Sequence, residues 1–153
     1  MPDDHLIAEQ VRVTTGLSAD QMDRTIHHLQ RRLIRSQRSL VRLEPLAGGP
    51  VMTVRASSLR PTARSFASLR GVEVRGYRIS PPPELELQTE VNRALQAALE
   101  ALTWTFREPQ TLRAWMHAPN AAFGGDTPAR VLEQGQPRAI ATVLNAARHG
   151  VAL

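Results

Sequence analysis

The 153-residue sequence predicts a mostly α (α+β) protein in two parts, an N-terminal part of helices and strands and an all-helical C-terminal part. Three observations predict this. Apolar residues recur every three or four positions in several segments, as on one face of an α-helix. Two short runs rich in β-branched residues flank a Gly-Gly pair in the first half. Three prolines, at 81–83, lack amide donors and favour extended backbone, so we divide the chain into residues 1–80 and 84–153.

The first two elements are predicted to be helices joined by a tight turn. A short helix covers residues 4–13, and Thr14-Thr15-Gly16 follows it. A second helix starts at Ser18, because Ser18 as N-cap with Gln21 three positions later forms a capping box. Its apolar residues lie four, three and four positions apart, which predicts one buried stripe. They are Met22, Ile26, Leu29 and Leu33.

The rest of the N-terminal part is predicted to contain strands. Residues 40–43 and 51–55 flank Gly48-Gly49, and this pattern is typical of a β-hairpin. Residues 72–79 alternate in polarity like one further strand, whereas residues 57–70 give no clear signal.

Prolines and caps divide the C-terminal part into helices. Residues 84–107 carry apolar residues at helical spacing and predict one long amphipathic helix. Pro109, Pro128 and Pro137 each suit the first turn of a further helix, where the missing N–H costs nothing. Thr127 is the expected cap before Pro128. The last helix is predicted to end at Arg148, before a C-terminal Gly150.

The composition excludes several function classes. The chain has 42% hydrophobic and 22% charged residues, and no apolar run approaches the roughly 18 residues of a membrane span. It contains no cysteine, and its histidines and acidic residues form no known metal or catalytic motif. We therefore expect no enzymatic activity, no metal and no cofactor. The acidic N-terminus is unlike a secretory signal, so a cytoplasmic protein without membrane contact is expected.

Charge is concentrated in the first half. Residues 29–80 contain eleven arginines against Glu44 and Glu73, and the chain has no lysine. Unrelieved positive charge destabilises a fold by self-repulsion, so this surplus favours a polyanionic partner such as DNA. The order helix, turn, Arg-rich helix and hairpin resembles a winged helix-turn-helix module. The candidate DNA-binding residues are Arg24, His27, His28, Arg31, Arg32, Arg35, Arg38, Arg42 and Arg55.

Such a module usually has one more helix before this pair. That helix is either missing here or replaced by a helix of a partner chain or by the long helix after the prolines. The stretch Phe123-Gly124-Gly125-Asp126-Thr127 lacks the lysine and spacing of a phosphate-binding loop and follows a helix. We interpret its glycines as a turn between helices.

The segment from about Glu90 to the C-terminus resembles the toxin-binding domain of the Xre/MbcA/ParS antitoxins. The similarity is carried by Ala114-Trp115-Met116, Pro119-Asn120, Gly125, Thr127-Pro128 and the final His149-Gly150-Val151, in order and in spacing. In that family the N-terminal module is usually a compact helical bundle, whereas residues 34–79 here predict strands and loops. The family positions matched by Trp115, Pro119, Gly125 and Pro128 are interpreted as structural.

This resemblance implies an antitoxin that neutralises a RES-domain, NAD-degrading toxin by occluding its active site. It also implies a homodimer that binds operator DNA to regulate its own operon. The residues that match the toxin-contacting end are Asn145, Arg148, His149, Val151 and Leu153. Two alternatives remain open. One is a winged-helix transcription regulator without a toxin, whose C-terminal helices serve dimerisation or ligand sensing. The other is a module whose Arg-rich half binds RNA or an acidic protein.

Overall fold

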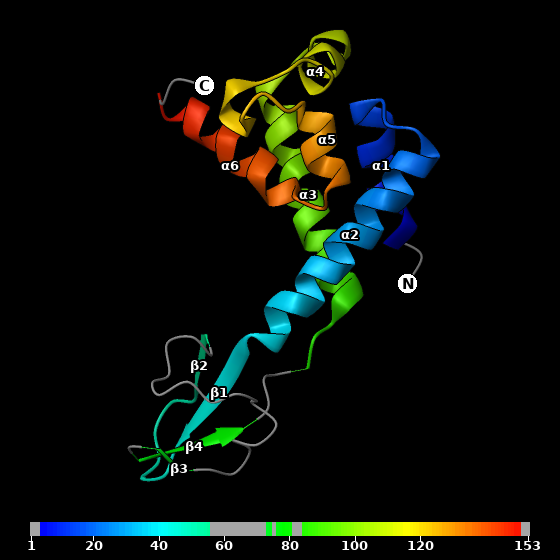
Figure 1. Ribbon diagram of the computed structural model, residues 1–153. Coiled ribbons are helices and arrows are strands. Elements are labelled where there is room, and N and C mark those ends of the chain that lie inside the picture. Colours follow the sequence, from blue (N-terminus) through cyan, green and yellow to red (C-terminus); the bar gives the residue numbers. More distant parts are fainter. Residues whose placement is uncertain (1–3, 56–72, 75, 81–83, 151–153) are drawn as a thin grey trace. The chain divides into compact units, whose positions relative to one another are not determined.

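The computed structural model describes residues 4–55, 73–74, 76–80 and 84–150. Within these ranges the chain is mostly α-helical, with one small antiparallel sheet, so the predicted mostly α (α+β) class is confirmed (Figure 1). Contacts divide the chain into two compact units. One contains residues 1–32 and 86–153, and the other contains residues 33–85. No described helix combines the length and the apolar character that crossing a membrane requires.

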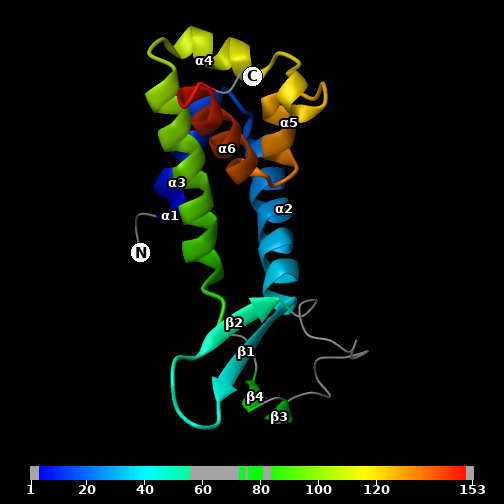
Figure 2. The ribbon, with the colours of Figure 1, turned by 90° about the vertical axis from the view of Figure 1, so that its left-hand side faces the viewer.

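The helical unit is built around α3 (Leu87–Thr105). α1 (Asp4–Thr15) packs along one side of α3, and α6 (Pro137–Arg148) packs along another (Figures 1 and 2). α4 (Pro109–Met116) contacts α1, and α5 (Pro128–Glu133) contacts α6. The largest fully buried side chains come from all of these helices and include Val11, Leu95, Leu102, Met116, Leu132, Ile140 and Leu144.

Helix α2 (Ala19–Arg38) begins as the capping box predicts. The Ser18 N–H donates to Gln21 Oε1 at 2.9 Å, and the Gln21 N–H donates to Ser18 Oγ at 3.2 Å. Met22 and Leu29 of the predicted stripe are buried, and Ile26 is half-buried. The border between the units, at residues 32 and 33, falls inside this helix.

The prediction from sequence grouped residues 1–32 with the strands, whereas their contacts are with the C-terminal helices. α1 and the first turns of α2 present apolar side chains that must be buried against another element. The strands of the second unit, described below, have few buried residues and offer little surface for this. α3 is that partner for α1. The long helix after the prolines therefore packs against the first helix of the predicted pair.

The described residues of the second unit form a four-stranded antiparallel sheet in the order β2-β1-β4-β3. β1 (Leu40–Pro45) and β2 (Met52–Arg55) form the predicted hairpin, with Val41 opposite Val54. Gly48 and Gly49 have φ of 81° and 131°, the conformations for which glycine is needed in this turn. Val41, Leu43 and Ile79 form a small core, with Val54 and Tyr77 packed against it.

One strand prediction is wrong. Residues 72–79 do not form one continuous strand but contribute two, β3 (Glu73–Val74) and β4 (Tyr77–Ser80), which pair with each other. Gly76 between them has φ 82°, which turns the chain back on itself. Polarity alternates along both arms of a hairpin as it does along a single strand, so alternation alone did not separate the two. Residues 57–70 and 72 lie outside the described residues.

Candidate functional site

A groove of about 670 Å³ lies between α3 and α6. It is lined by three alanines from the two helices, one tryptophan, one arginine and three polar residues. The lining residues are Ala97, Glu100, Ala101, Thr103, Trp104, Ala141, Asn145 and Arg148. Ala101 and Ala141 are each only 8% exposed, because the two helices pack closely at this level.

Trp104 is the large aromatic residue of this groove, and 60% of its surface is exposed. The buried stripe of α3 contains Leu95 and Leu102, so a residue two positions after Leu102 points away from that stripe. The Arg148 guanidinium lies over the Trp104 ring, 3.5 Å from its centre. A guanidinium at this distance is attracted by the negative face of the ring.

The packing of α6 positions the lining residues of the groove that come from this helix. Ile140 and Leu144 are buried in the helical unit, and Asn145 and Arg148 follow them at the exposed edge of the same helix. His149 caps the helix, and its N–H donates to the carbonyls of Asn145 and Ala146 at 3.3 and 3.1 Å. α6 and its capping residue therefore carry three predicted contact residues at the C-terminal end of the helix.

Two of the five predicted toxin-contact residues, Asn145 and Arg148, line the groove, and both are exposed. His149 is exposed at the helix end, whereas Val151 and Leu153 lie outside the described residues. The apolar stripe that predicts α3 does not include Trp104, so the spacing pattern did not single this residue out. The sequence signal that could have found it is a tryptophan at a position of the helix that lies outside the apolar stripe.

The Gly-rich stretch that follows α4 forms a turn. Asn120 Oδ1 accepts a hydrogen bond from the Ala122 N–H at 2.9 Å, and Gly124 and Gly125 have φ of 66° and 91°. Thr127 Oγ1 then accepts from the Arg130 N–H at 3.2 Å and caps α5. The glycines and caps thus reverse the chain between two helices, as predicted.

Trp115 has a different environment from Trp104. It is half-buried, with its ring 5.3 Å from that of Phe106 and 6.3 Å from that of Phe123. Tilted and edge-to-face aromatic pairs at such distances add to the stability given by burial. This cluster joins α3, α4 and the turn before α5, which agrees with the structural role expected for Trp115.

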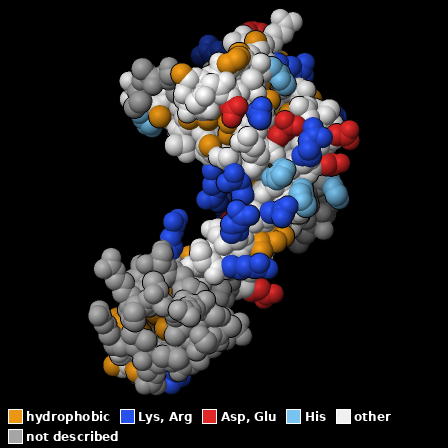
Figure 3. All heavy atoms as spheres, viewed as in Figure 1, with side chains coloured by type: hydrophobic (Ala, Val, Ile, Leu, Met, Phe, Trp, Pro, Cys, Tyr) orange, Lys and Arg blue, Asp and Glu red, His pale blue; other side chains and the backbone are white. Residues whose placement is uncertain are grey.

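The second candidate surface is the basic face of α2, where arginine and histidine side chains gather (Figure 3). His27, His28, Arg31, Arg35 and Arg38 are all exposed there. Among the described residues their side chains form no hydrogen bond or ion pair, and the rings of the two histidines contact each other at 5.8 Å. These side chains are available to an anionic partner.

Two other arginines of α2 are engaged within the helical unit. Arg24 Nη2 forms an ion pair with Glu133 Oε1 at 2.9 Å, and Arg32 Nε donates to the Gln134 carbonyl at 2.9 Å. Both partners lie more than one hundred residues away in the sequence. Arg24 and Arg32 therefore fix α2 to the end of α5, a role that the charge pattern alone did not distinguish from DNA contact.

The two arginines predicted in the hairpin lie on the sheet. Arg42 is half-buried, and its Nε lies 3.4 Å from Glu44 Oε1 in an ion pair without hydrogen-bond geometry. Arg55 is exposed at the end of β2 and interacts with another residue. Arg42 is thus already partly neutralised by its own strand.

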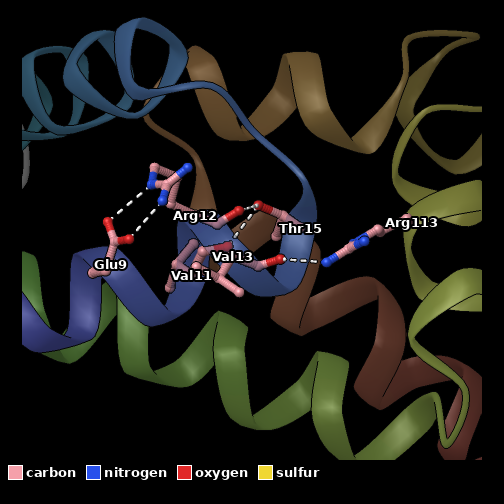
Figure 4. Close-up of polar contacts among 6 residues, drawn as sticks. All are labelled: Glu9, Val11, Arg12, Val13, Thr15 and Arg113. Atoms are coloured by element: carbon pink, nitrogen blue, oxygen red, sulfur yellow. Dashed lines mark hydrogen bonds and ion pairs between the residues drawn. The ribbon is translucent and has the colours of Figure 1, made fainter.

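A third set of polar contacts joins α1 to α4 (Figure 4). Arg113 Nη2 donates to the Val13 carbonyl at 3.1 Å, and the Thr15 carbonyl accepts from His117 Nε2 at 3.1 Å. On α1 itself, Arg12 Nε donates to Glu9 Oε2 at 2.8 Å. This hydrogen bond, more than the charge of the guanidinium, lowers the pKa of the Glu9 carboxyl.

Comparison with known proteins bears on the groove. Residues 98–150 match the family model for the C-terminal toxin-binding domain of the antitoxins Xre/MbcA/ParS. No curated protein and no solved structure gives a match. The matched segment runs from within α3 to just after α6 and contains Trp104, Asn145 and Arg148. The resemblance predicted from the sequence is confirmed, and it supports an antitoxin of a toxin–antitoxin system.

Proposed function

We propose that this chain, whose residues 98–150 match an antitoxin toxin-binding domain, neutralises a RES-domain toxin that degrades NAD. The observation that carries the proposal is the groove between α3 and α6, whose lining residues except Ala97 belong to the matched segment. This groove combines an exposed tryptophan with a cation and small residues. Tryptophan and arginine are enriched among the residues that dominate protein–protein binding energy.

The proposed mechanism is steric occlusion. α6 and the residues after it bind at the entrance of the toxin's active site, and NAD is then excluded. Arg148 supplies positive charge at the end of the helix, His149 supplies a polar ring, and Val151 and Leu153 supply an apolar tip. The chain needs no catalytic group for this task, since it acts by occupying the space of the substrate.

Co-expression with the RES-domain toxin of the same operon tests this proposal. A tagged chain should retain the toxin during purification, and cellular NAD should stay at the level of cells without toxin. If the toxin is not retained and NAD still falls, the chain is not its antitoxin. A transcription regulator without a toxin partner then becomes the better account.

Deletion of residues 151–153 tests the occlusion step. The shortened chain should keep its helical circular dichroism but protect NAD less well, because the apolar tip is gone. Deletion of residues 1–3 at the other end of the chain is the matched control and should leave protection unchanged. Full protection by the chain that lacks residues 151–153 would exclude a role for the tip.

We also propose that the chain binds operator DNA as a homodimer and so regulates its own operon. The exposed basic residues of α2 support this, because helices with clustered arginines bind phosphates and bases in the major groove. A labelled promoter fragment should bind with an affinity that falls steeply with salt. An affinity that does not change with salt would contradict the proposed contacts with phosphate.

A further inference from the structure

The Arg148 side chain is held in place without a polar partner. Its guanidinium lies over the Trp104 ring, and among the described residues it forms no hydrogen bond or ion pair. Three other exposed arginines of the C-terminal part do face carboxylates. They are Arg93 and Arg138, both beside Glu90, and Arg130 beside Asp126.

Stacking of this kind prepares an arginine for one class of ligand. A ring below the guanidinium occupies its flat face and leaves the N–H groups, which lie in its plane, directed away from the ring. Those N–H groups match the two oxygens of a carboxylate, with which arginine forms paired, charge-assisted hydrogen bonds. Little side-chain entropy remains to be lost, since Trp104 already restricts Arg148.

The rest of the groove limits the shape of the ligand. Ala97, Ala101 and Ala141 carry only a methyl group, so a polypeptide backbone has room to approach both helices. Asn145 adds an amide that pairs with either a backbone N–H or a carbonyl. Glu100, whose Oε1 accepts from Gln96 Nε2 at 2.9 Å, repels a second anion. These features fit a peptide segment with a single acidic side chain better than they fit a phosphate-rich ligand.

We propose that the groove receives an aspartate or glutamate of the toxin, bound by Arg148 while the neighbouring part of that segment covers Trp104. This inference rests on the proposed function and adds the chemistry of the partner to it. Trp104 acts as a positioning residue, because it orients the guanidinium, and also supplies apolar contact area.

Binding of purified, catalytically inactivated RES-domain toxin to variants of the full chain tests the inference. Arg148→Gln and Trp104→Ala should each weaken the complex by about tenfold or more, and Arg148→Lys should weaken it less than Arg148→Gln. Arg130→Gln, an exposed arginine outside the groove, is the matched control and should change the affinity by less than about threefold.

The double variant tests the positioning role of Trp104. If Trp104 works partly by orienting Arg148, the loss of binding free energy in the variant that combines Trp104→Ala with Arg148→Gln should be clearly smaller than the sum of the two single losses. The emission of Trp104, taken as wild type minus Trp104→Phe, should move to shorter wavelength when the toxin binds. Single losses that add up fully in the double variant, or a Trp104 emission that saturating toxin does not change, would overturn the role proposed for Trp104.

The two proposals fail in different ways. If the wild-type chain does not bind the toxin, both fall. If wild type, Arg148→Gln and Trp104→Ala bind the toxin equally, only the proposal for the groove falls.

NAD alone serves as a probe of whether the groove binds a nucleotide instead. Quenching of Trp104 fluorescence by NAD without toxin would overturn the choice of a protein carboxylate. Because the Trp104 and Arg148 side chains are exposed, the circular dichroism of their variants should match that of the wild type.

Discussion

Gly135, in the turn between α5 and α6, lies directly against the backbone of Leu29 in α2. A Cβ added at Gly135 would be 2.4 Å from the Leu29 nitrogen, a distance that no side chain tolerates. The ion pair of Arg24 with Glu133 and the hydrogen bond of Arg32 to Gln134 lie beside this contact. The first part of α2 is thus held to the C-terminal helices by backbone packing as well as by charge.

Gly135→Ala is therefore expected to destabilise the chain. Its φ of 77° costs a residue with a Cβ about 1–2 kcal/mol, and the clash with α2 adds about 1–3 kcal/mol. Gly124→Ala is the matched control, because Gly124 has φ 66° and nothing within 4 Å of an added Cβ. Urea unfolding followed by circular dichroism should show the larger loss for Gly135→Ala. Equal losses would mean that the contact with Leu29 does not hold α2.

Ser18→Ala should lower the free energy of unfolding by about 1 kcal/mol, because it removes the side-chain oxygen that caps α2. The same urea titration measures this change. Ser36→Ala, an exposed serine near the other end of α2, is the control and should have an effect within about 0.5 kcal/mol. A Ser18→Ala variant as stable as Ser36→Ala would show that the cap contributes nothing.

Replacing Arg31 and Arg35 together by Ala should reduce the salt dependence of operator binding. The slope of log K against log salt is negative, and each lost phosphate contact should make it less steep by about 0.9. Replacing Arg93 and Arg130 by Ala gives the control double variant, because both are exposed and lie on other helices. Its salt dependence should match that of the wild type. Toxin binding should be the same in all three proteins. Loss of toxin binding in the Arg31/Arg35 variant would contradict a division between the two surfaces.

The pKa of Glu9 should lie below the ordinary value of a glutamate, because its carboxylate accepts hydrogen bonds from Arg12. A carboxyl with a lowered pKa in the folded state stabilises that state at higher pH. This contribution is lost as the pH falls through the folded-state pKa. NMR titration of the side chain should show the lowered pKa in wild type and an ordinary value in Arg12→Ala. The same pKa in both proteins would contradict the role of Arg12.

Local signals in the sequence predicted much of the fold. Pro109, Pro128 and Pro137 each begin a helix in the structure, because proline fixes the backbone angle that a first turn needs. The box of Ser18 and Gln21 likewise marks the start of α2. Such signals act over three or four residues and therefore depend little on the rest of the chain.

What the sequence did not reveal depends on distant contacts. The roles of Arg24 and Arg32 follow from Glu133 and Gln134, which become neighbours only when α2 meets the end of α5. Trp104 is significant because Arg148 stacks on it from another helix. A helical pattern shows which side chains point outward, but it does not show which outward residues from separate helices meet.

We propose that the chain blocks a RES-domain toxin by occupying its active-site entrance. Titration of NAD degradation by the purified toxin with increasing amounts of the chain tests this most directly. We predict that activity falls in proportion to the toxin bound and reaches zero when all of it is bound. A complex that forms fully but still degrades NAD at the rate of free toxin would contradict the claim.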